Sequence, residues 1–276
     1  MKTRIITALF MALFGLPLLI FSKYIIYPIA AGIFAAVALF EMAGVIGIRK
    51  NFALTVPTYA VALALPICAY FFSHRMTDFI FVALVIIIAV MLYLFGYAVV
   101  SRGEVKFADI ATHFTTFTYV TVSFTALTLV RYLPNGVYNF VLIFVGSWVS
   151  DVFAYFVGRA IGRHKMIPEI SPKKTWEGAV GGVFFTVVAF LVYGIIVSYV
   201  STDIRPNYVI LALLGIMLST VSIFGDLIAS LIKREHGVKD YGFIFPGHGG
   251  VLDRFDSILA VAPVLFATCM LFPPFV

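Results

Sequence analysis

The sequence contains little charge and little cysteine. Only 12% of its 276 residues are charged, whereas 62% are hydrophobic, and the mean hydropathy is +1.08. This composition excludes an ordinary soluble domain, because the apolar runs reach the ~20 residues that a helix needs to cross a bilayer. The two cysteines, Cys68 and Cys269, both lie in apolar runs, which argues against a disulfide framework, a cysteine metal site or a catalytic cysteine pair. We expect both to pack in the core.

The N-terminal stretch lacks a small-residue cleavage site. Residues 1–21, MKTRIITALFMALFGLPLLIF, otherwise resemble a signal sequence, but another apolar run follows at once. We therefore expect this stretch to be retained as the first of nine membrane spans. Each span is expected to be a helix, because backbone groups in hydrocarbon must be satisfied within their own segment. The predicted spans cover residues 5–21, 24–48, 53–72, 78–100, 109–130, 137–158, 178–200, 207–232 and 252–272.

The fold class predicted from these spans is an all-α, polytopic integral membrane protein. Residues 1–108, with the first four spans, carry no recognisable motif, and we expect them to serve packing and lipid access. Residues 109–276 hold the last five spans and the loops 159–177 and 233–251, which contain most of the polar chemistry. We predict that this second region carries the function.

Basic residues are scarce on one side of the predicted membrane topology. If the spans alternate, fifteen of the 19 Lys and Arg residues lie on one side, and only Lys23, Arg75, Arg131 and Arg205 lie on the other. The positive-inside rule then predicts a cytoplasmic N-terminus, an extracytoplasmic C-terminus, and a cytoplasmic location for both loops. The net charge of +6 does not indicate a nucleic-acid partner, because the cations line short loops and form no basic domain.

The sixth predicted span carries a stripe of small and polar residues. Gly158 and Gly162 are four residues apart, and we favour close helix packing over ligand approach as their role. The stripe follows helical spacing and ends at the cytoplasmic side. Its members are Ser147, Ser150, Asp151, Ala154, Tyr155 and Gly158.

The segment SPKKTWEG, residues 171–178, has the features of a helix start. Ser171 is predicted to cap the helix and Pro172 to occupy its first position, so that free N–H groups face the loop. Such an end attracts phosphate, and Lys173 and Lys174 would add two cations for a triphosphate. The alternative is an ordinary positive-inside anchor, with Trp176 at the membrane interface.

The eighth predicted span places an acidic residue inside the membrane boundary. Asp226 lies there about a turn and a half deep, where an ionised carboxylate is costly unless a partner or a water-filled cavity receives it. This position predicts a functional residue. The alternative is a structural salt bridge with Lys233, two turns along the same face. That face carries Ser219, Ser222, Asp226, Ser230 and Lys233.

The segment that follows combines glycines with carboxylates. Asp253 and Asp256 are three residues apart at the start of the ninth helix, and Asp226 is expected to meet them. Three such carboxylates repel one another unless a cation holds them, and oxygen ligands without a nearby thiol favour Mg²⁺. His248 is expected to hydrogen-bond phosphate or ribose rather than to recruit a transition metal. The glycines let the backbone approach a ligand. They are Gly237, Gly242, Gly247, Gly249 and Gly250.

Residues 230–257, SLIKREHGVKDYGFIFPGHGGVLDRFDS, resemble the signature of the phosphatidate cytidylyltransferases, the CDP-diacylglycerol synthases. The segment SPKKTWEG resembles the second block shared by that family, and the polytopic layout is similar across the chain. The first five spans match in architecture only, and the short N-terminus is similar to that of the bacterial members. The fixed positions of the signature are matched by Ser230, Lys233, Arg234, Lys239, Asp240, Pro246, His248, Gly249, Gly250, Asp253, Arg254 and Asp256.

The resemblance implies a reaction in which CTP and phosphatidic acid give CDP-diacylglycerol and pyrophosphate. It also implies a homodimer in a bacterial inner membrane, with the active site facing the cytoplasm. We assign Asp226 and Asp253 to Mg²⁺, with Asp256 as a supporting ligand or the ligand of a second cation. The predicted phosphate-binding cations are Lys233, Arg234, Lys239, Arg254, Lys173 and Lys174, and the other predicted substrate-binding residues are Ser230, Asp240, His248, Gly249, Gly250, Asp151 and Tyr155.

Three other functions compete with this interpretation. An ion-coupled transporter of an anionic solute would use Glu41, Asp151 and Asp226 as a cation path, but the span pattern shows no inverted repeat. A CTP-dependent lipid or polyprenol kinase shares the phosphate chemistry. A membrane scaffold without catalysis leaves the intramembrane Asp226 unexplained.

Overall fold

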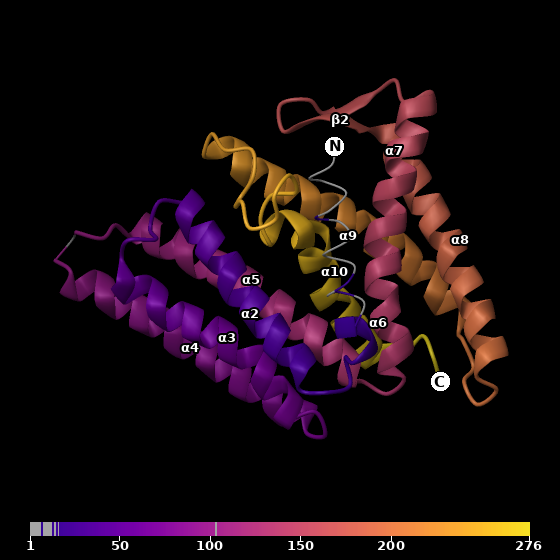
Figure 1. The fold of residues 1–276 in the computed structure, drawn as a ribbon, viewed down its shortest axis with the longest axis horizontal. Coiled ribbons are helices and arrows are strands. Elements are labelled where there is room, and N and C mark those ends of the chain that lie inside the picture. The colour runs from indigo at the N-terminus through magenta and orange to yellow at the C-terminus, as the bar shows by residue number, and fades with distance from the viewer. Residues whose placement is uncertain (1–6, 8–12, 14, 16, 103) are drawn as a thin grey trace. The chain divides into compact units, whose positions relative to one another are not determined.

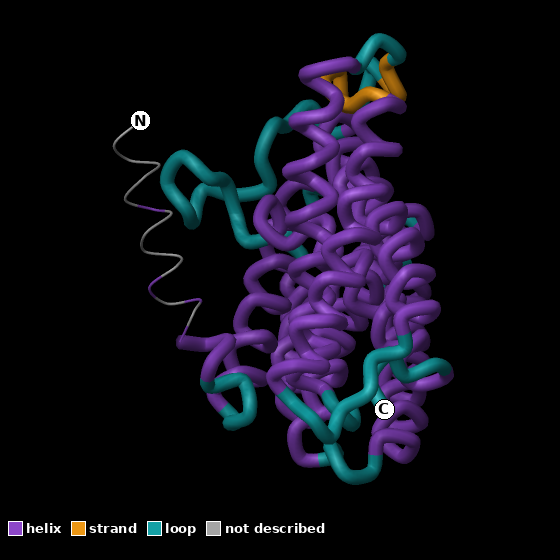
Figure 2. Tube along the Cα trace, turned by 90° about the vertical axis from the view of Figure 1, so that its right-hand side faces the viewer, coloured by secondary structure: helices purple, strands orange, loops and turns teal. Residues whose placement is uncertain are grey.

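The computed structural model describes residues 7, 13, 15, 17–102 and 104–276. Nearly all of this part of the chain is helical, as the apolar runs predict (Figures 1 and 2). Helices α6, η1 and α7 follow one another without a break, and η1 is a single π-helical turn. The helices are α2 (Ile26–Val45), α3 (Phe52–Phe71), α4 (Met76–Val100), α5 (Phe107–Tyr132), α6 (Gly136–Phe144), η1 (Val145–Val149), α7 (Ser150–Ile161), α8 (Trp176–Val200), α9 (Tyr208–Glu235) and α10 (Leu252–Leu271).

Seven of the described helical segments are long and apolar enough to cross a membrane. They are α2, α3, α4, the continuous segment Gly136–Ile161, α8, α9 and α10, which agree with seven of the predicted spans to within a few residues. The chain is therefore a polytopic, almost wholly helical membrane protein. The predicted span 109–130 is also a helix, α5, but it is rich in threonine and falls outside the seven. Most of the predicted span 5–21 lies outside the described residues.

The prediction that a helix begins at Ser171 is wrong. Residues Ser171–Thr175 form strand β2, which pairs antiparallel with β1 (Lys165–Ile167), and α8 begins only at Trp176. Pro172 suits an extended strand as well as a first helical turn, and the hairpin partner decides between them. The cap of α8 is Thr175, whose side-chain oxygen accepts a hydrogen bond from Gly178 N at 3.2 Å.

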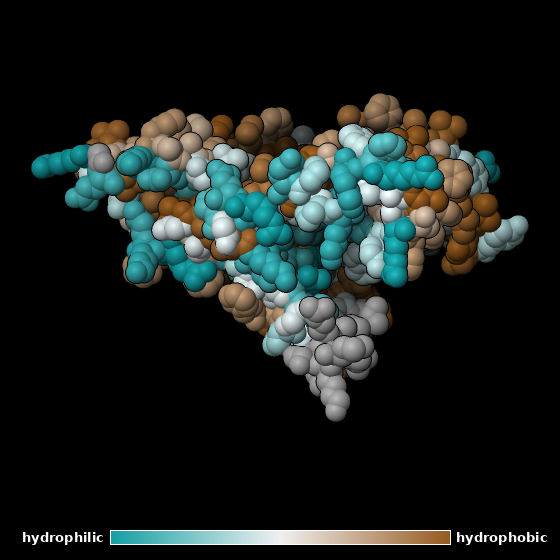
Figure 3. All heavy atoms as spheres, turned by 90° about the horizontal axis from the view of Figure 1, so that it is seen from above, coloured by the Kyte–Doolittle hydropathy of each residue, from teal (hydrophilic) through white to brown (hydrophobic). Residues whose placement is uncertain are grey.

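The hairpin is attached to the start of α8 by Glu177. Its two carboxylate oxygens accept hydrogen bonds from His164 N, each at 3.2 Å, and Oε1 lies 2.6 Å from His164 Nδ1. Figure 2 shows the two strands in orange at the ends of the helices that they connect. Figure 3 views the molecule from above, and hydrophilic side chains cover much of the visible face. In the hairpin itself Lys165, Glu169 and Lys173 are exposed, which agrees with a hairpin that lies in water rather than in lipid.

The chain divides into two compact units. Unit 1 contains residues 1–129 and 238–254, and unit 2 contains residues 130–237 and 255–276. Within unit 1, α2 packs along α3 (Figure 1). The side chain of His113 on α5 is buried, and its Nε2 lies 3.1 Å from Thr58 Oγ1 on α3. The functional division at residue 108 made from the sequence is a different partition of the chain and stays a prediction.

Unit 2 is built on glycine contacts between α7 and α8, which lie side by side in Figure 1. A β-carbon at Gly178 would lie 3.2 Å from Gly158 Cα, and one at Gly182 would lie 2.8 Å from Ser150 O. A β-carbon at Gly162 would similarly contact the side chain of Thr175. The prediction that Gly158 serves helix packing is confirmed, because it lies against Gly178 of α8. Gly162 follows the end of α7 and packs against Thr175, the residue that caps α8.

Candidate functional site

A salt bridge of unit 2 joins the hairpin to α9. Lys174 Nζ lies 2.8 Å from Asp226 Oδ2, and the two side chains are only 21% and 31% exposed. The same ammonium donates a hydrogen bond to Ile223 O at 3.1 Å, near the point where α9 carries Asp226. Lys174 therefore supplies the partner that an intramembrane carboxylate needs. Its neighbour Lys173 is exposed, because successive residues of a strand point to opposite sides.

Asp226 belongs to a group of three carboxylates in unit 2. It acts electrostatically on both Asp151 of α7 and Asp256 of α10. Ser257 connects the latter two, because its Oγ lies 3.3 Å from Asp151 Oδ2 and 3.3 Å from Asp256 Oδ1. Lys174 compensates only part of this negative charge. A group of carboxylates with this excess of negative charge favours a bound cation.

The carboxylate oxygens of each unit are donors of the kind that Mg²⁺ binds together with nucleotide phosphates. Among the described residues, no group of three or more His, Cys, Asp or Glu side chains is close enough to enclose a metal ion by itself. Mg²⁺ rarely needs such a cage, since it keeps several waters and binds through one or two carboxylates and substrate phosphates. Asp226 and Asp256 provide oxygen donors of this kind in unit 2, and Asp253 provides one in unit 1.

Asp253 is buried in unit 1 and organises the segment before α10. Its side chain is 7% exposed, and its Oδ2 accepts hydrogen bonds from Tyr241 N at 2.8 Å and from Gly250 N at 3.0 Å. Gly249 has a φ of +84°, and a β-carbon there would lie 2.7 Å from the same Oδ2. The turn before α10 is therefore shaped around this carboxylate, and Gly249 is required by both its conformation and its surroundings.

Glu41 of α2 is the functional candidate whose role the sequence did not reveal. Its side chain is buried, its Oε1 accepts from Val251 N, and its Oε2 accepts from Leu252 N, both at 3.0 Å. The sequence placed Glu41 only in the cation path of the rival transporter. The one available signal was a single carboxylate within an apolar span, which marks a functional candidate but does not identify a partner 210 residues away.

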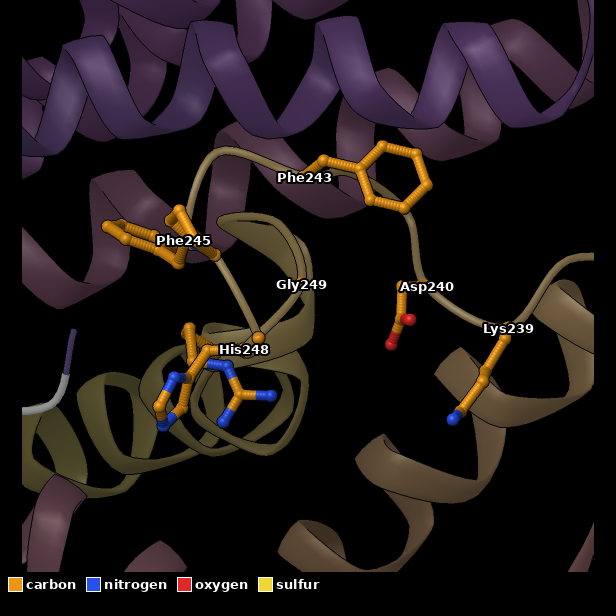
Figure 4. Close-up of a pocket in the computed structure, with 9 residues that line it drawn as sticks. Lys239, Asp240, Phe243, Phe245, His248 and Gly249 are labelled. Atoms are coloured by element: carbon orange, nitrogen blue, oxygen red, sulfur yellow. The ribbon is translucent and has the colours of Figure 1, made fainter. Parts of the chain in front are cut away.

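A pocket of about 470 Å³ lies in unit 1 beside this turn. Figure 4 shows Lys239 and Asp240 on one side of the pocket, and Phe245 and His248 on the other. His248 Nδ1 is buried and has no hydrogen-bond partner among the described residues, so one polar atom of the pocket lining is left unsatisfied. The volume is that of an ordinary small-molecule site. The lining residues are Lys239, Asp240, Phe243, Phe245, Pro246, Gly247, His248, Gly249 and Arg254.

The structure thus brings five predicted substrate-binding residues into one pocket and places the others elsewhere in the chain. Ser230, Lys233 and Arg234 occupy the last turns of α9 in unit 2. Tyr155 is exposed on α7, where its hydroxyl accepts a hydrogen bond from Arg159 Nη1 at 3.2 Å. The five that line the pocket are Lys239, Asp240, His248, Gly249 and Arg254.

The chain is similar to known proteins over nearly its whole length. The model of the cytidylyltransferase family matches residues 2–272. A phosphatidate cytidylyltransferase of Staphylococcus haemolyticus is 35% identical over 266 residues, which cover 96% of this chain and 97% of the relative. Another from Staphylococcus aureus (strain COL) is 34% identical over 265 residues, with the same coverage of both chains. The chain belongs to the cytidylyltransferase family.

Proposed function

We propose that this protein is a phosphatidate cytidylyltransferase, which transfers CMP from CTP to phosphatidic acid and releases pyrophosphate. The observation that carries the proposal is the pocket beside α10, in which Lys239, Arg254 and His248 surround a space of about 470 Å³. The bacterial relatives that bear this name match nearly the whole chain. Cations, a half-buried imidazole and aromatic rings suit a nucleotide phosphate and its base.

The chemistry requires charge control rather than a strong base. The nucleophile is a phosphate oxygen of phosphatidic acid, whose second pKa is about 6 in comparable esters, so it is already largely ionised at neutral pH. It attacks the α-phosphorus of CTP, a new P–O bond forms, and the bond to the bridging oxygen of the β-phosphate breaks. Pyrophosphate leaves with that electron pair. Catalysis of such a step comes mainly from positioning and from cations around the phosphates.

The cations of the chain are assigned to the phosphates of the two substrates. Lys239 and Arg254 line the pocket and bind the nucleotide phosphates, and a guanidinium can do so through two hydrogen bonds. Lys233 and Arg234 bind the CTP phosphates or the lipid phosphate, and Lys173 binds the triphosphate or the departing pyrophosphate. Lys174 is held by Asp226 and sets the charge of the carboxylate group.

Mg²⁺ is the cofactor that we propose for this site. Asp226 and Asp253 would hold it, with Asp256 as a supporting ligand or the ligand of a second cation. When bound, the ion would neutralise charge on the phosphates of CTP. Asp151 joins the set because Ser257 connects it with Asp256. The support is the oxygen character of the donors and the position of Asp253 and Asp256 near the start of α10.

The topology proposed for the chain has nine spans, a cytoplasmic N-terminus and an extracytoplasmic C-terminus. The unequal distribution of Lys and Arg supports it. The site then faces the cytoplasm of a bacterial inner membrane, where CTP and pyrophosphate are soluble, while phosphatidic acid reaches it from the bilayer. We further propose a homodimer, which rests on the family resemblance alone.

One assay separates this activity from its nearest rival. Purified protein in detergent receives phosphatidic acid, Mg²⁺ and CTP labelled with ³²P in either the α- or the γ-phosphate. A cytidylyltransferase moves the α-label into lipid and releases the γ-label in pyrophosphate, whereas a kinase moves the γ-label into lipid. Absence of α-labelled lipid above a protein-free blank overturns the proposal.

The alternative function, an ion-coupled transporter, has less support from the contacts of Glu41 than from the sequence alone. Both carboxylate oxygens of Glu41 accept backbone N–H groups, so the residue that would begin the cation path serves another purpose.

A further inference from the structure

We propose that Glu41 is a positioning residue for the transfer reaction. It acts from α2 on the start of α10, where Asp253 and Arg254 lie. The inference rests on the proposed function, but the contacts that carry it lie entirely within unit 1. Glu41 is 3% exposed and lies near the C-terminal end of α2, a helix long and apolar enough to span a membrane. A carboxylate at such a place is costly, so it persists where it has specific partners.

The partners of Glu41 are the amides at the N-terminus of α10. The first N–H groups of a helix have no acceptor within the helix, and a side chain close in sequence usually provides one. Here Val251 N and Leu252 N instead donate to the two oxygens of Glu41, each at 3.0 Å. A carboxylate also interacts favourably with the positive end of the helix dipole. Glu41 is thus a capping anion that comes from a distant helix and fixes where α10 begins.

Two glycines of the segment 230–257 leave space for this carboxylate. A β-carbon at Gly242 or at Gly250 would overlap the carboxylate of Glu41. Neither glycine has a φ in the left-handed region, unlike Gly249 at +84°, so the backbone itself would accept alanine at both positions. The requirement for glycine at 242 and 250 is therefore one of space, and Glu41 creates it.

Gly250 connects Glu41 to the candidate metal ligand. Its N–H donates to Asp253 Oδ2 at 3.0 Å, while its α-carbon faces the carboxylate of Glu41. Tyr241 N donates to the same Oδ2 at 2.8 Å, one residue before Gly242, which also faces Glu41. A movement of the Glu41 carboxylate therefore displaces the two backbone amides that orient Asp253. This is how a residue of α2 acts on chemistry that it does not touch.

A double-mutant cycle tests the connection. Glu41→Ala and Gly250→Ala are made singly and together, and Gly96→Ala serves as control because nothing lies within 4 Å of a β-carbon at that position. Each single variant at the turn is expected to lower kcat by about 10- to 100-fold, as for residues that orient metal ligands. The double variant is expected to lose little more than Glu41→Ala alone, because the added methyl group enters the space that the carboxylate leaves. If the loss of kcat in the double variant equals the product of the two single losses, the proposal is overturned.

The isosteric variant Glu41→Gln separates positioning from plain stability. Its amide nitrogen cannot accept a hydrogen bond, so one of the two capped amides loses its acceptor while the shape of the side chain is kept. We expect faster hydrogen exchange at Val251 and Leu252 and a lower kcat per folded molecule, with the folded fraction measured by size exclusion and thermal unfolding. A wild-type kcat per folded molecule shows that Glu41 is structural only and overturns the proposal.

Failure of the proposed function gives a different result. Wild-type protein would then form no CDP-lipid, whereas exchange at Val251 and Leu252 still reports whether Glu41 caps α10. Unchanged exchange in Glu41→Gln removes the contact on which the positioning role depends.

Discussion

Replacement of Lys174 by methionine is the perturbation with the clearest expected result. The change removes the ammonium that lies 2.8 Å from Asp226 Oδ2 and keeps most of the aliphatic stem. The matched control is Lys173→Met, because Lys173 is the adjacent residue of β2 and is exposed. Both variants lose one positive charge from the same hairpin. A difference between them therefore reports the ion pair rather than the net charge.

The magnitude follows from distance and burial. Two unit charges at this separation attract by about 6 kcal/mol at an effective dielectric constant of about 20, before the cost of desolvation. Exposed pairs retain about 0–1 kcal/mol of net stabilisation, and loss of one partner from a fully buried pair costs about 3–5 kcal/mol. The side chains here are 21% and 31% exposed, so the pair lies between these limits. We expect Lys174→Met to lower the free energy of unfolding by about 2 kcal/mol.

The assay combines thermal unfolding in detergent with the α-labelled CTP reaction. Lys174→Met should melt at a lower temperature and lose about 10²-fold in kcat/KM, because Asp226 then lacks its cation beside Asp151 and Asp256. Lys173→Met should melt like the wild type and change mainly the KM for CTP. Equal melting temperatures and equal activities in the two variants would refute the ion pair as a determinant of either property.

Three further predictions concern the metal ligand, the helix packing and the topology. Asp253→Asn keeps an acceptor for Tyr241 N and Gly250 N, so it should fold normally and lose almost all activity, and wild-type turnover would remove this carboxylate from the metal site. Gly178→Ala should destabilise unit 2 by about 1–3 kcal/mol through overpacking, as measured by thermal unfolding. The control Gly96→Ala should be neutral or stabilising. Equal effects of the two substitutions would count against close α7–α8 packing. In a cysteine-free background, Lys165→Cys should react with an impermeant maleimide only from the cytoplasmic side and Arg205→Cys only from the opposite side. Exchanged sides would reverse the topology, and labelling from one common side would contradict a membrane crossing by α8.

The membrane helices were predictable because their cause is local. The ends of α9 and α10 lie within three residues of the predicted spans 207–232 and 252–272. A run of apolar residues long enough for the bilayer must form a helix wherever it occurs, since no other conformation satisfies its backbone there. Helix α5 was predicted for the same reason, although its threonines make it less apolar than the seven candidate spans.

The hairpin between α7 and α8 was missed because its cause is not local. The segment around Pro172 is compatible with a helix start and with a strand, and only pairing with β1 selects the strand. The same pairing moves the helix cap from Ser171 to Thr175 and orients Lys174 toward Asp226. Two adjacent lysines that look equivalent in sequence thereby become different in role.

The sequence by itself determined the class of the protein, its helices and the segment that carries its chemistry, since hydropathy and motif spacing are properties of neighbouring residues. The tertiary structure alone decided which carboxylates work together. It joined Asp226 to Lys174, linked Asp151 to Asp256 through Ser257, and brought Glu41 to the amides that begin α10. Electrostatic and hydrogen-bonded contacts depend on distance in space. The periodicity of the sequence therefore does not reveal a contact between residues 210 positions apart.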